Sequence, residues 1–210
     1  MDESERWDTC LRWGARGGKT VGVVGAAVFS WLMAGAFLSG SGAADAAPPD
    51  LCSLIAAKDT SRIVPLPRTS HQTDPRHDVR NEAECNVTSG KAWLRDGGRY
   101  GRLHINLTRH GNTRQGDGWS EARETYNRSK KYDAGDGSAP RDVPGVGEEA
   151  YVEVRSKPAS GGQSGRRAEA ELTVLLGKDV LNVKYVARPS TPKLAREVAV
   201  ATSAAVLGGL

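Results

Sequence analysis

Four side chains that could bind a metal ion lie close together in the chain: His71, Asp74, His77 and Asp78. Imidazole and carboxylate groups are common zinc ligands, but a site also needs a frame that fixes their geometry. The surrounding sequence is polar and contains prolines, and it has neither helical nor strand periodicity. We therefore expect no metal site here, and nothing elsewhere in the chain indicates a cofactor.

His104 and His110 are expected on the polar side of one strand, six residues apart. Histidine can act as a general acid or base near neutral pH. Catalysis would also need a nucleophile and a group that orients the imidazole, and the sequence identifies neither. We predict two surface histidines. A concave pocket that holds either one, with a shifted pKa and a nearby nucleophile, would instead favour a hydrolase.

Three short motifs resemble known signatures but have the wrong spacing. Ser164 is followed by Gly165 and Arg166, whereas the nucleophile elbow G-x-S-x-G needs glycine where Arg166 stands. Residues 133–142 hold aspartates and glycines, but lack the alternating acidic positions and closing glutamate of an EF-hand. Residues 14–19 are too short for a P-loop and follow no strand. The sequence therefore predicts no catalytic residues.

One turn is the best candidate for a specific role. It has a proline and two glycines, which favour a tight approach into a strand. Folding alone explains such a turn, and an interaction site is the alternative. Its residues are Val143, Pro144, Gly145, Val146, Gly147 and Glu148.

The charge of the chain is mildly positive. The formal net charge is +4 over 210 residues, with a hydrophobic content of 38% and an aromatic content of 6%. This excess of positive charge favours solubility and could favour binding to anionic envelope polymers, but it is spread along the sequence. A diffuse charge does not indicate a nucleic-acid-binding protein.

Residues 21–38 form an uncharged apolar segment whose only strongly polar group is Ser30. As a helix it would span roughly 27 Å, close to the ~30 Å hydrocarbon core of a bilayer. Arg12, Arg16 and Lys19 precede it, so the positive-inside rule places the N-terminus in the cytoplasm. We expect a short cytoplasmic tail (1–20), a transmembrane or signal helix (21–38), a linker (39–49) and an exported domain (50–210).

Two fates of this segment remain open. It is long for a signal peptide, which favours a single-pass anchor in the cell membrane. The small residues around Ala44-Asp45-Ala46 fit a cleavage site, so secretion after cleavage near Ala46 is the alternative.

Three cysteines are distributed over the two sides of the membrane. Cys10 falls on the cytoplasmic side, whereas Cys52 and Cys85 fall outside, where disulfides persist. Two exported thiols in one small domain most simply pair, and closing that loop would stabilise the fold by ~3–4 kcal/mol. A metal site is the alternative, but no C-x-x-C motif is present.

The sequence of the exported part predicts an α+β fold, in which helices cover one face of an antiparallel sheet. Alternation in residues 100–110 and short turns between the later strands indicate antiparallel pairing. The expected strands are one or two within 83–94, then 100–110, 150–155, 168–176 and 180–187. The expected helices begin at Asp50, Asp117 and Thr191, and loops cover 60–81, 133–144 and 157–167.

Several of these features together resemble a known family. They are Asp50-Leu51-Cys52-Ser53-Leu54-Ile55, a second cysteine at Cys85, the stretch from Asp142 to Tyr151, and the final hairpin and helix. This pattern is similar to the actinobacterial envelope lipoproteins grouped as domain of unknown function family 3558. Ser41 stands where such proteins carry a lipidated cysteine. The resemblance implies an exported, disulfide-bonded α+β domain and brings no catalytic residues.

We therefore expect a non-enzymatic envelope protein whose domain binds an envelope protein, a glycan or a small ligand. A hydrolase with an unrecognised active site is the alternative. A membrane contact through residues 21–38 follows if the segment is not cleaved, and no nucleic-acid partner is expected.

Overall fold

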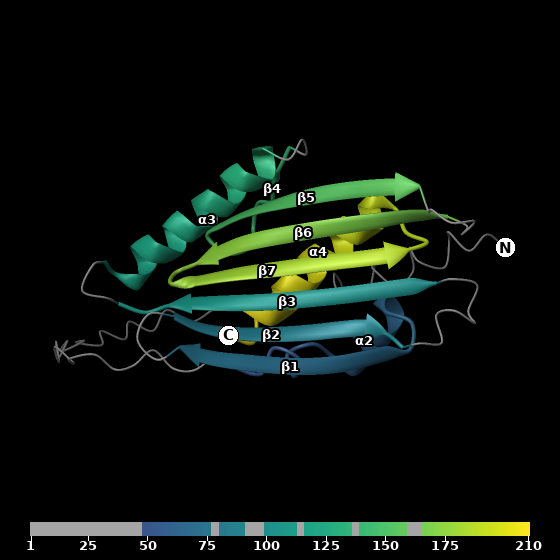
Figure 1. Cartoon of the computed structure of the whole chain (residues 1–210), viewed down its shortest axis with the longest axis horizontal. Coiled ribbons are helices and arrows are strands. Elements are labelled where there is room, and N and C mark those ends of the chain that lie inside the picture. The colour runs from purple at the N-terminus through teal and green to yellow at the C-terminus, as the bar shows by residue number, and fades with distance from the viewer. Residues whose placement is uncertain (1–47, 77–79, 91–98, 113–115, 136–138, 159–164) are drawn as a thin grey trace, which may run out of the picture. The chain divides into compact units, whose positions relative to one another are not determined.

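In the part of the chain that the structure describes, seven strands form a single antiparallel sheet and three helices accompany it (Figure 1). The computed structural model describes residues 48–76, 80–90, 99–112, 116–135, 139–158 and 165–210. The strands are β1 Pro67–Arg76, β2 Arg80–Ser89, β3 Tyr100–His110, β4 Arg141–Asp142, β5 Glu149–Pro158, β6 Arg166–Leu176 and β7 Asp179–Arg188. The helices are α2 Ala57–Ile63, α3 Gly118–Gly135 and α4 Pro192–Leu207.

The strand order is β1-β2-β3-β7-β6-β5-β4, so the last strand pairs with the third. β7 lies between β3 and β6, and Ile105 faces Val183 across the β3–β7 pair. This order brings two groups of strands that are far apart in the sequence into one continuous surface. The α+β class and the antiparallel pairing agree with the sequence-based prediction.

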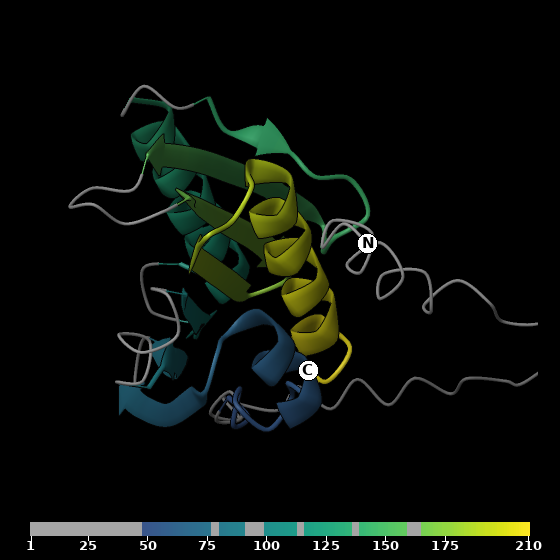
Figure 2. The same ribbon diagram turned by 90° about the vertical axis from the view of Figure 1, so that its right-hand side faces the viewer.

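One face of the sheet carries the main core. Leu103, Ile105 and Leu107 alternate with polar residues along β3 and are fully buried, as the alternation predicts. α4 covers this face (Figure 2). Thr191 begins α4 as predicted, because its side chain accepts a hydrogen bond from the Leu194 N–H at 3.1 Å.

α3 packs on the other side of the sheet, at one end of it (Figure 2). Its Ala122 and Tyr126 lie against Tyr151, Leu175 and Val180, which point away from the main core. The expectation that helices cover one face is therefore wrong for α3. The small second core fixes the helix, and burial in it raises the pKa of Tyr126 to about 12.

Two elements near the start of the domain differ from the sequence-based expectation. The predicted loop at 60–81 contains β1, an exposed edge strand with few apolar residues and therefore no alternating signal. The predicted helix at Asp50 is a run of turns, and α2 begins only at Ala57. Leu51 and Ile55 are nevertheless buried in the core, and Leu54 is partly buried against it.

The predicted tail and the predicted anchor or signal segment (21–38) lie outside the described residues. Among the residues that are described, no helix is long and apolar enough to cross a membrane.

Candidate functional site

The face of the sheet opposite α4 is polar, and we call it the open face. One row of residues crosses it, each directly facing the next on the neighbouring strand: Asn86, His104, Lys184, Glu171 and Glu153. These five residues come from β2, β3, β7, β6 and β5. Strand register therefore brings together groups that are up to 98 positions apart in the sequence (Asn86 to Lys184).

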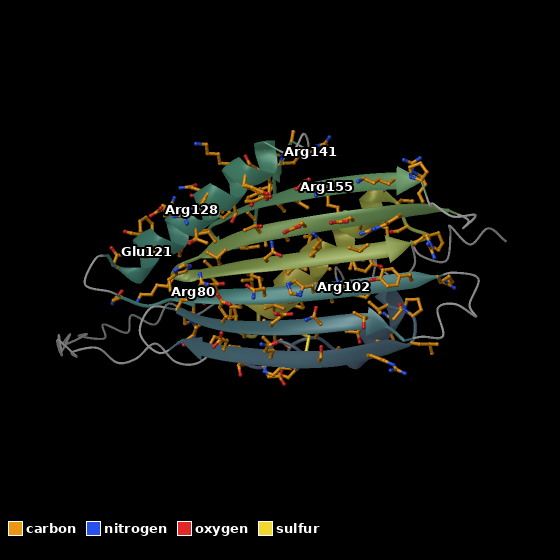
Figure 3. All side chains as sticks on the ribbon, viewed as in Figure 1. Arg80, Arg102, Glu121, Arg128, Arg141 and Arg155 are labelled. Atoms are coloured by element: carbon orange, nitrogen blue, oxygen red, sulfur yellow. A yellow bond between two sulfur atoms is a disulfide. The ribbon has the colours of Figure 1, made fainter. Side chains whose placement is uncertain are left out.

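Basic side chains gather at the end of the open face that α3 leaves uncovered, and Figure 3 labels two of them, Arg102 and Arg155. Tyr100 faces Arg188 across β3 and β7, and Lys157 faces Arg167 across β5 and β6. We define the cationic end as Arg102, Arg155, Lys157, Arg167, Lys184 and Arg188. Three carboxylates, Glu153, Glu169 and Glu171, lie among these six cations, so this end of the face carries an excess of positive charge.

A pocket of about 360 Å³ opens at the cationic end. Three basic side chains and one histidine supply its polar groups, and an aromatic ring and an aliphatic side chain supply apolar contact. The lining residues are Tyr100, Arg102, His104, Arg167, Lys184 and Val186. Such a pocket suits a small anionic group attached to a partly apolar body.

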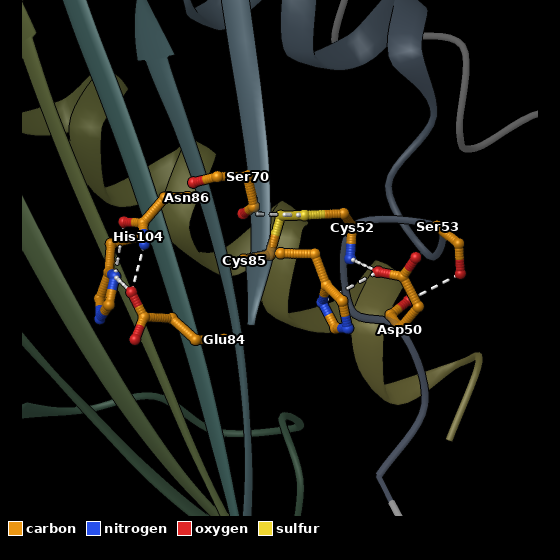
Figure 4. Close-up of a disulfide and its surroundings, with 9 residues drawn as sticks. Asp50, Cys52, Ser53, Ser70, Glu84, Cys85, Asn86 and His104 are labelled. Carbon is orange, nitrogen blue, oxygen red and sulfur yellow. Dashed lines mark hydrogen bonds and ion pairs between the residues drawn. A yellow bond between two sulfur atoms is a disulfide. The ribbon is translucent and has the colours of Figure 1, made fainter. Parts of the chain in front are cut away.

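His104 is held in one orientation by two neighbours on β2 (Figure 4). Its Nδ1 is 2.8 Å from Asn86 Oδ1 and 3.4 Å from Glu84 Oε1. Both neighbours of Nδ1 are acceptor oxygens, so Nδ1 carries the proton and Nε2 is left as an acceptor. Burial lowers the pKa of His104 below its usual value, although Glu84 opposes this effect, and the imidazole is neutral at pH 7.

Lys184 and Arg167 share a carboxylate. Lys184 Nζ is 2.9 Å from both Glu169 and Glu171, and Arg167 Nη2 is 3.1 Å from Glu169. Burial lowers the pKa of Lys184, but its hydrogen bonds to the two glutamates outweigh burial, so the pKa lies above its usual value. Lys184 therefore stays a cation and is too basic to act as a nucleophile at neutral pH.

The end of the open face beneath α3 is more deeply buried. Burial raises the pKa of Glu153, which is only 4% exposed and forms an ion pair with Arg155. Tyr151 donates a hydrogen bond to Asp133 Oδ2 at 2.8 Å. The hydrogen bond from Tyr151 to Asp133 attaches α3 to the sheet.

The predicted disulfide is present. Cys52 and Cys85 are bonded, with their Cα atoms 5.2 Å apart (Figure 4). The bond joins the segment before α2 to β2 on the core side of the sheet. It lies on the opposite face from the pocket.

The predicted turn from Val143 to Glu148 lies at the other end of the sheet from the pocket. Val143 and Val146 are buried, and the Glu148 N–H donates to the Leu175 carbonyl at 2.9 Å. Glu148 Oε1 also accepts from the Gly177 N–H at 2.9 Å, which links this turn to the β6–β7 turn. These contacts account for most of the turn by folding alone.

The histidines and the other candidate metal ligands are separated. His104 lines the pocket, whereas His110 is buried beside the start of α3. His71 pairs with Asp50, Asp74 is in β1, and His77 and Asp78 lie outside the described residues. Sequence reasoning missed Arg102, Arg167 and Lys184. The only sequence signal for these three residues was the alternation of polar residues along their strands. The sequence does not show how those strands align with one another.

The fold and the pocket together define an α+β domain with an open, charged sheet face. Comparison of the chain with protein-family models, with curated proteins and with solved structures found no match. The resemblance to the actinobacterial envelope lipoproteins therefore stays a prediction.

Proposed function

We propose that this chain is an exported cell-envelope protein whose domain binds an anionic ligand at the cationic end of the open face, without catalysis. The observation that carries the proposal is the pocket in which Arg102, Arg167 and Lys184 surround the neutral His104. A cluster of cations around a small cavity attracts and orients carboxylate or phosphate groups.

Arg102 is the cation best placed to bind a ligand. Arg167 and Lys184 are already paired with glutamates. Arg102 is exposed, and no described residue forms an ion pair or hydrogen bond with it. A guanidinium group can bind a carboxylate or phosphate through two parallel hydrogen bonds.

An anionic glycan fits the other lining groups. His104 Nε2 offers an acceptor for a sugar hydroxyl, while Tyr100 and Val186 offer contact for the body of a sugar ring. Carboxylated and phosphorylated envelope glycans share this chemistry. The proposal includes either source, and the experiment distinguishes them.

The test is titration of the ¹⁵N-labelled protein with polygalacturonate, with poly(glycerol phosphate) and with uncharged dextran. We expect one of the two anionic polymers to shift the resonances of Arg102, His104 and Val186, and dextran to shift none. Arg102→Gln should weaken binding about tenfold or more, the effect of one charge-assisted hydrogen bond. The matched control is Arg128→Gln, because Arg128 is exposed on α3 and pairs only with Glu124 among described residues. Equal affinity of the two variants would refute the proposal.

One observation favours the alternative, a hydrolase. His104 lies in a pocket, has a lowered pKa and has its Nδ1 oriented by Glu84, which are features of a general base. The pocket-lining residues include no serine, threonine or cysteine, so a water molecule would have to be the nucleophile. Release of polymer fragments by the wild type but not by His104→Gln would favour the hydrolase over the binding domain.

We also propose that residues 21–38 anchor the chain in the cell membrane, with the N-terminus in the cytoplasm and the α+β domain outside. Secretion after cleavage near Ala46 is the alternative. The length and charge pattern of the segment support the anchor. Intact mass of the protein in membrane and culture-fluid fractions separates the two fates, since only cleavage yields a soluble chain beginning near Ala47.

A further inference from the structure

The Cys52–Cys85 disulfide lies beside Asp50 (Figure 4), and His71 is close to both Asp50 and Cys52. His71 Nδ1 is 3.2 Å from Asp50 Oδ1, and the ligand atoms of Asp50, Cys52 and His71 all lie within 4.8 Å of one another. His71 also directly faces Cys85 across the β1–β2 pair. One imidazole nitrogen, one carboxylate and the Cys52 sulfur therefore meet at the sheet edge, and the Cys85 sulfur is bonded to that of Cys52.

The backbone fixes the positions of these four residues. His71 and Cys85 are set by the register of two paired strands. Asp50 is held by its own turn, in which the Cys52 N–H donates to Asp50 Oδ1 at 2.9 Å and Ser53 Oγ donates to the Asp50 carbonyl at 2.7 Å. Such a frame is what a metal site needs to hold its ligand geometry.

We propose that the reduced protein binds one zinc ion through Asp50, Cys52, His71 and Cys85, and that formation of the disulfide releases it. This proposal is independent of ligand binding at the cationic end, because the two sites lie on opposite faces of the sheet.

The ligand set matches zinc chemistry. Zinc in structural sites is bound by four tetrahedral ligands drawn from thiolate sulfur, imidazole nitrogen and carboxylate oxygen. Thiolate ligands select zinc over magnesium and calcium, which prefer oxygen. Cys52 Sγ lies 3.5 Å from the Ser70 carbonyl oxygen, so the reduced thiol has a hydrogen-bond acceptor in place before the metal binds.

The exchange between the two states balances. A dithiol reductant gives two electrons and two protons to the Cys52–Cys85 bond and becomes a cyclic disulfide itself. The two cysteine thiols then release those two protons when they bind Zn²⁺ as thiolates. In the reverse direction, the two cysteine thiolates give two electrons to a disulfide oxidant, whose own sulfur–sulfur bond breaks to leave two thiols after uptake of two protons from water. The Cys52–Cys85 bond re-forms and Zn²⁺ leaves. Either state joins the 50–55 segment to β2.

The test uses the full-length protein, reduced with a phosphine in oxygen-free buffer and titrated with Co²⁺ as a spectroscopic substitute for Zn²⁺. We expect one Co²⁺ per chain, with the intense visible bands of a tetrahedral site and a thiolate charge-transfer band, both removed by Zn²⁺. His71→Ala and Asp50→Asn should each weaken Zn²⁺ binding at least about tenfold, as even loss of a supporting partner does in zinc sites. Asp74→Asn is the matched control, because Asp74 lies on the same strand but faces the opposite side of the sheet.

Absence of the tetrahedral spectrum in reduced wild type, or equal Zn²⁺ affinity of wild type and His71→Ala, would overturn the proposal. If reduction alone unfolds the chain, far-UV circular dichroism will detect the loss of secondary structure. Addition of Zn²⁺ should then restore the folded circular-dichroism spectrum of reduced wild type but not that of reduced His71→Ala. If Zn²⁺ restored neither, or restored both equally, the proposal would be wrong.

Discussion

Arg109 and Asp179 form a two-point ion pair that closes the end of the β3–β7 pair. Arg109 Nε and Nη2 each lie 2.8 Å from one Asp179 oxygen, and both side chains are largely buried. Asp179→Ala should lower the free energy of unfolding by about 1.5–3 kcal/mol, the range for hydrogen bonds to charged groups. Urea denaturation measures this loss. If the two residues act as a pair, adding Arg109→Met to the Asp179→Ala variant should lower the free energy of unfolding only slightly further.

The two glycines of the Val143–Glu148 turn should differ in their tolerance of a side chain. Both have positive φ, which costs a non-glycine residue about 1–2 kcal/mol. A Cβ on Gly147 would lie 2.4 Å from Val174 Cγ1, whereas a Cβ on Gly145 would meet nothing within 4 Å. Gly147→Ala should therefore lose about 1–3 kcal/mol more stability than Gly145→Ala. Equal thermal and urea stability of the two variants would show that the turn relaxes freely.

The disulfide should be a major source of stability. It closes a loop with a sequence separation of 33 residues, for which chain entropy predicts a contribution of about 3–4 kcal/mol. The Cys52→Ser/Cys85→Ser double variant should lose this amount in urea denaturation under metal-free conditions. A metal chelator in the buffer ensures that the measured loss of stability comes from the disulfide alone, and not from zinc bound to any reduced wild-type chain.

The domain should lose stability as the pH falls below about 6.5, the ordinary pKa of histidine. Burial lowers the pKa of both His104 and His110, so the unfolded chain binds more protons than the folded chain in that range. Protons therefore favour the unfolded state. Urea denaturation as a function of pH checks this sign. The His104→Gln/His110→Gln variant should show a flatter slope there than wild type, whatever its absolute stability.

The helices and strands that have a clear local sequence pattern were predicted correctly. β3 was predicted over its full length because Leu103, Ile105 and Leu107 alternate with polar residues. The start of α4 followed from Thr191 and Pro192. β1 was missed because an exposed edge strand buries too few apolar side chains to leave a pattern.

The candidate pocket was not predictable in the same way. His104 was recognised as polar and as facing one side of its strand. Its pocket neighbours Arg167 and Lys184 come from β6 and β7, and only the placement of β7 beside β3 brings them near. Strand order depends on how the whole sheet packs, and sequence periodicity carries no information about it. The disulfide could be predicted because it followed from compartment and cysteine number.

The position of the disulfide also decides how the domain responds to mechanical load. Cys52 lies before α2, and its bond to Cys85 joins it to β2. Tension applied from the N-terminal side therefore enters the sheet at β2, and the covalent bond shields residues 53–84 from it. In the oxidised protein α2 and β1 lie outside the load path. After reduction the same tension would act first on α2 and on the edge strand β1, which is held to the sheet on one side only.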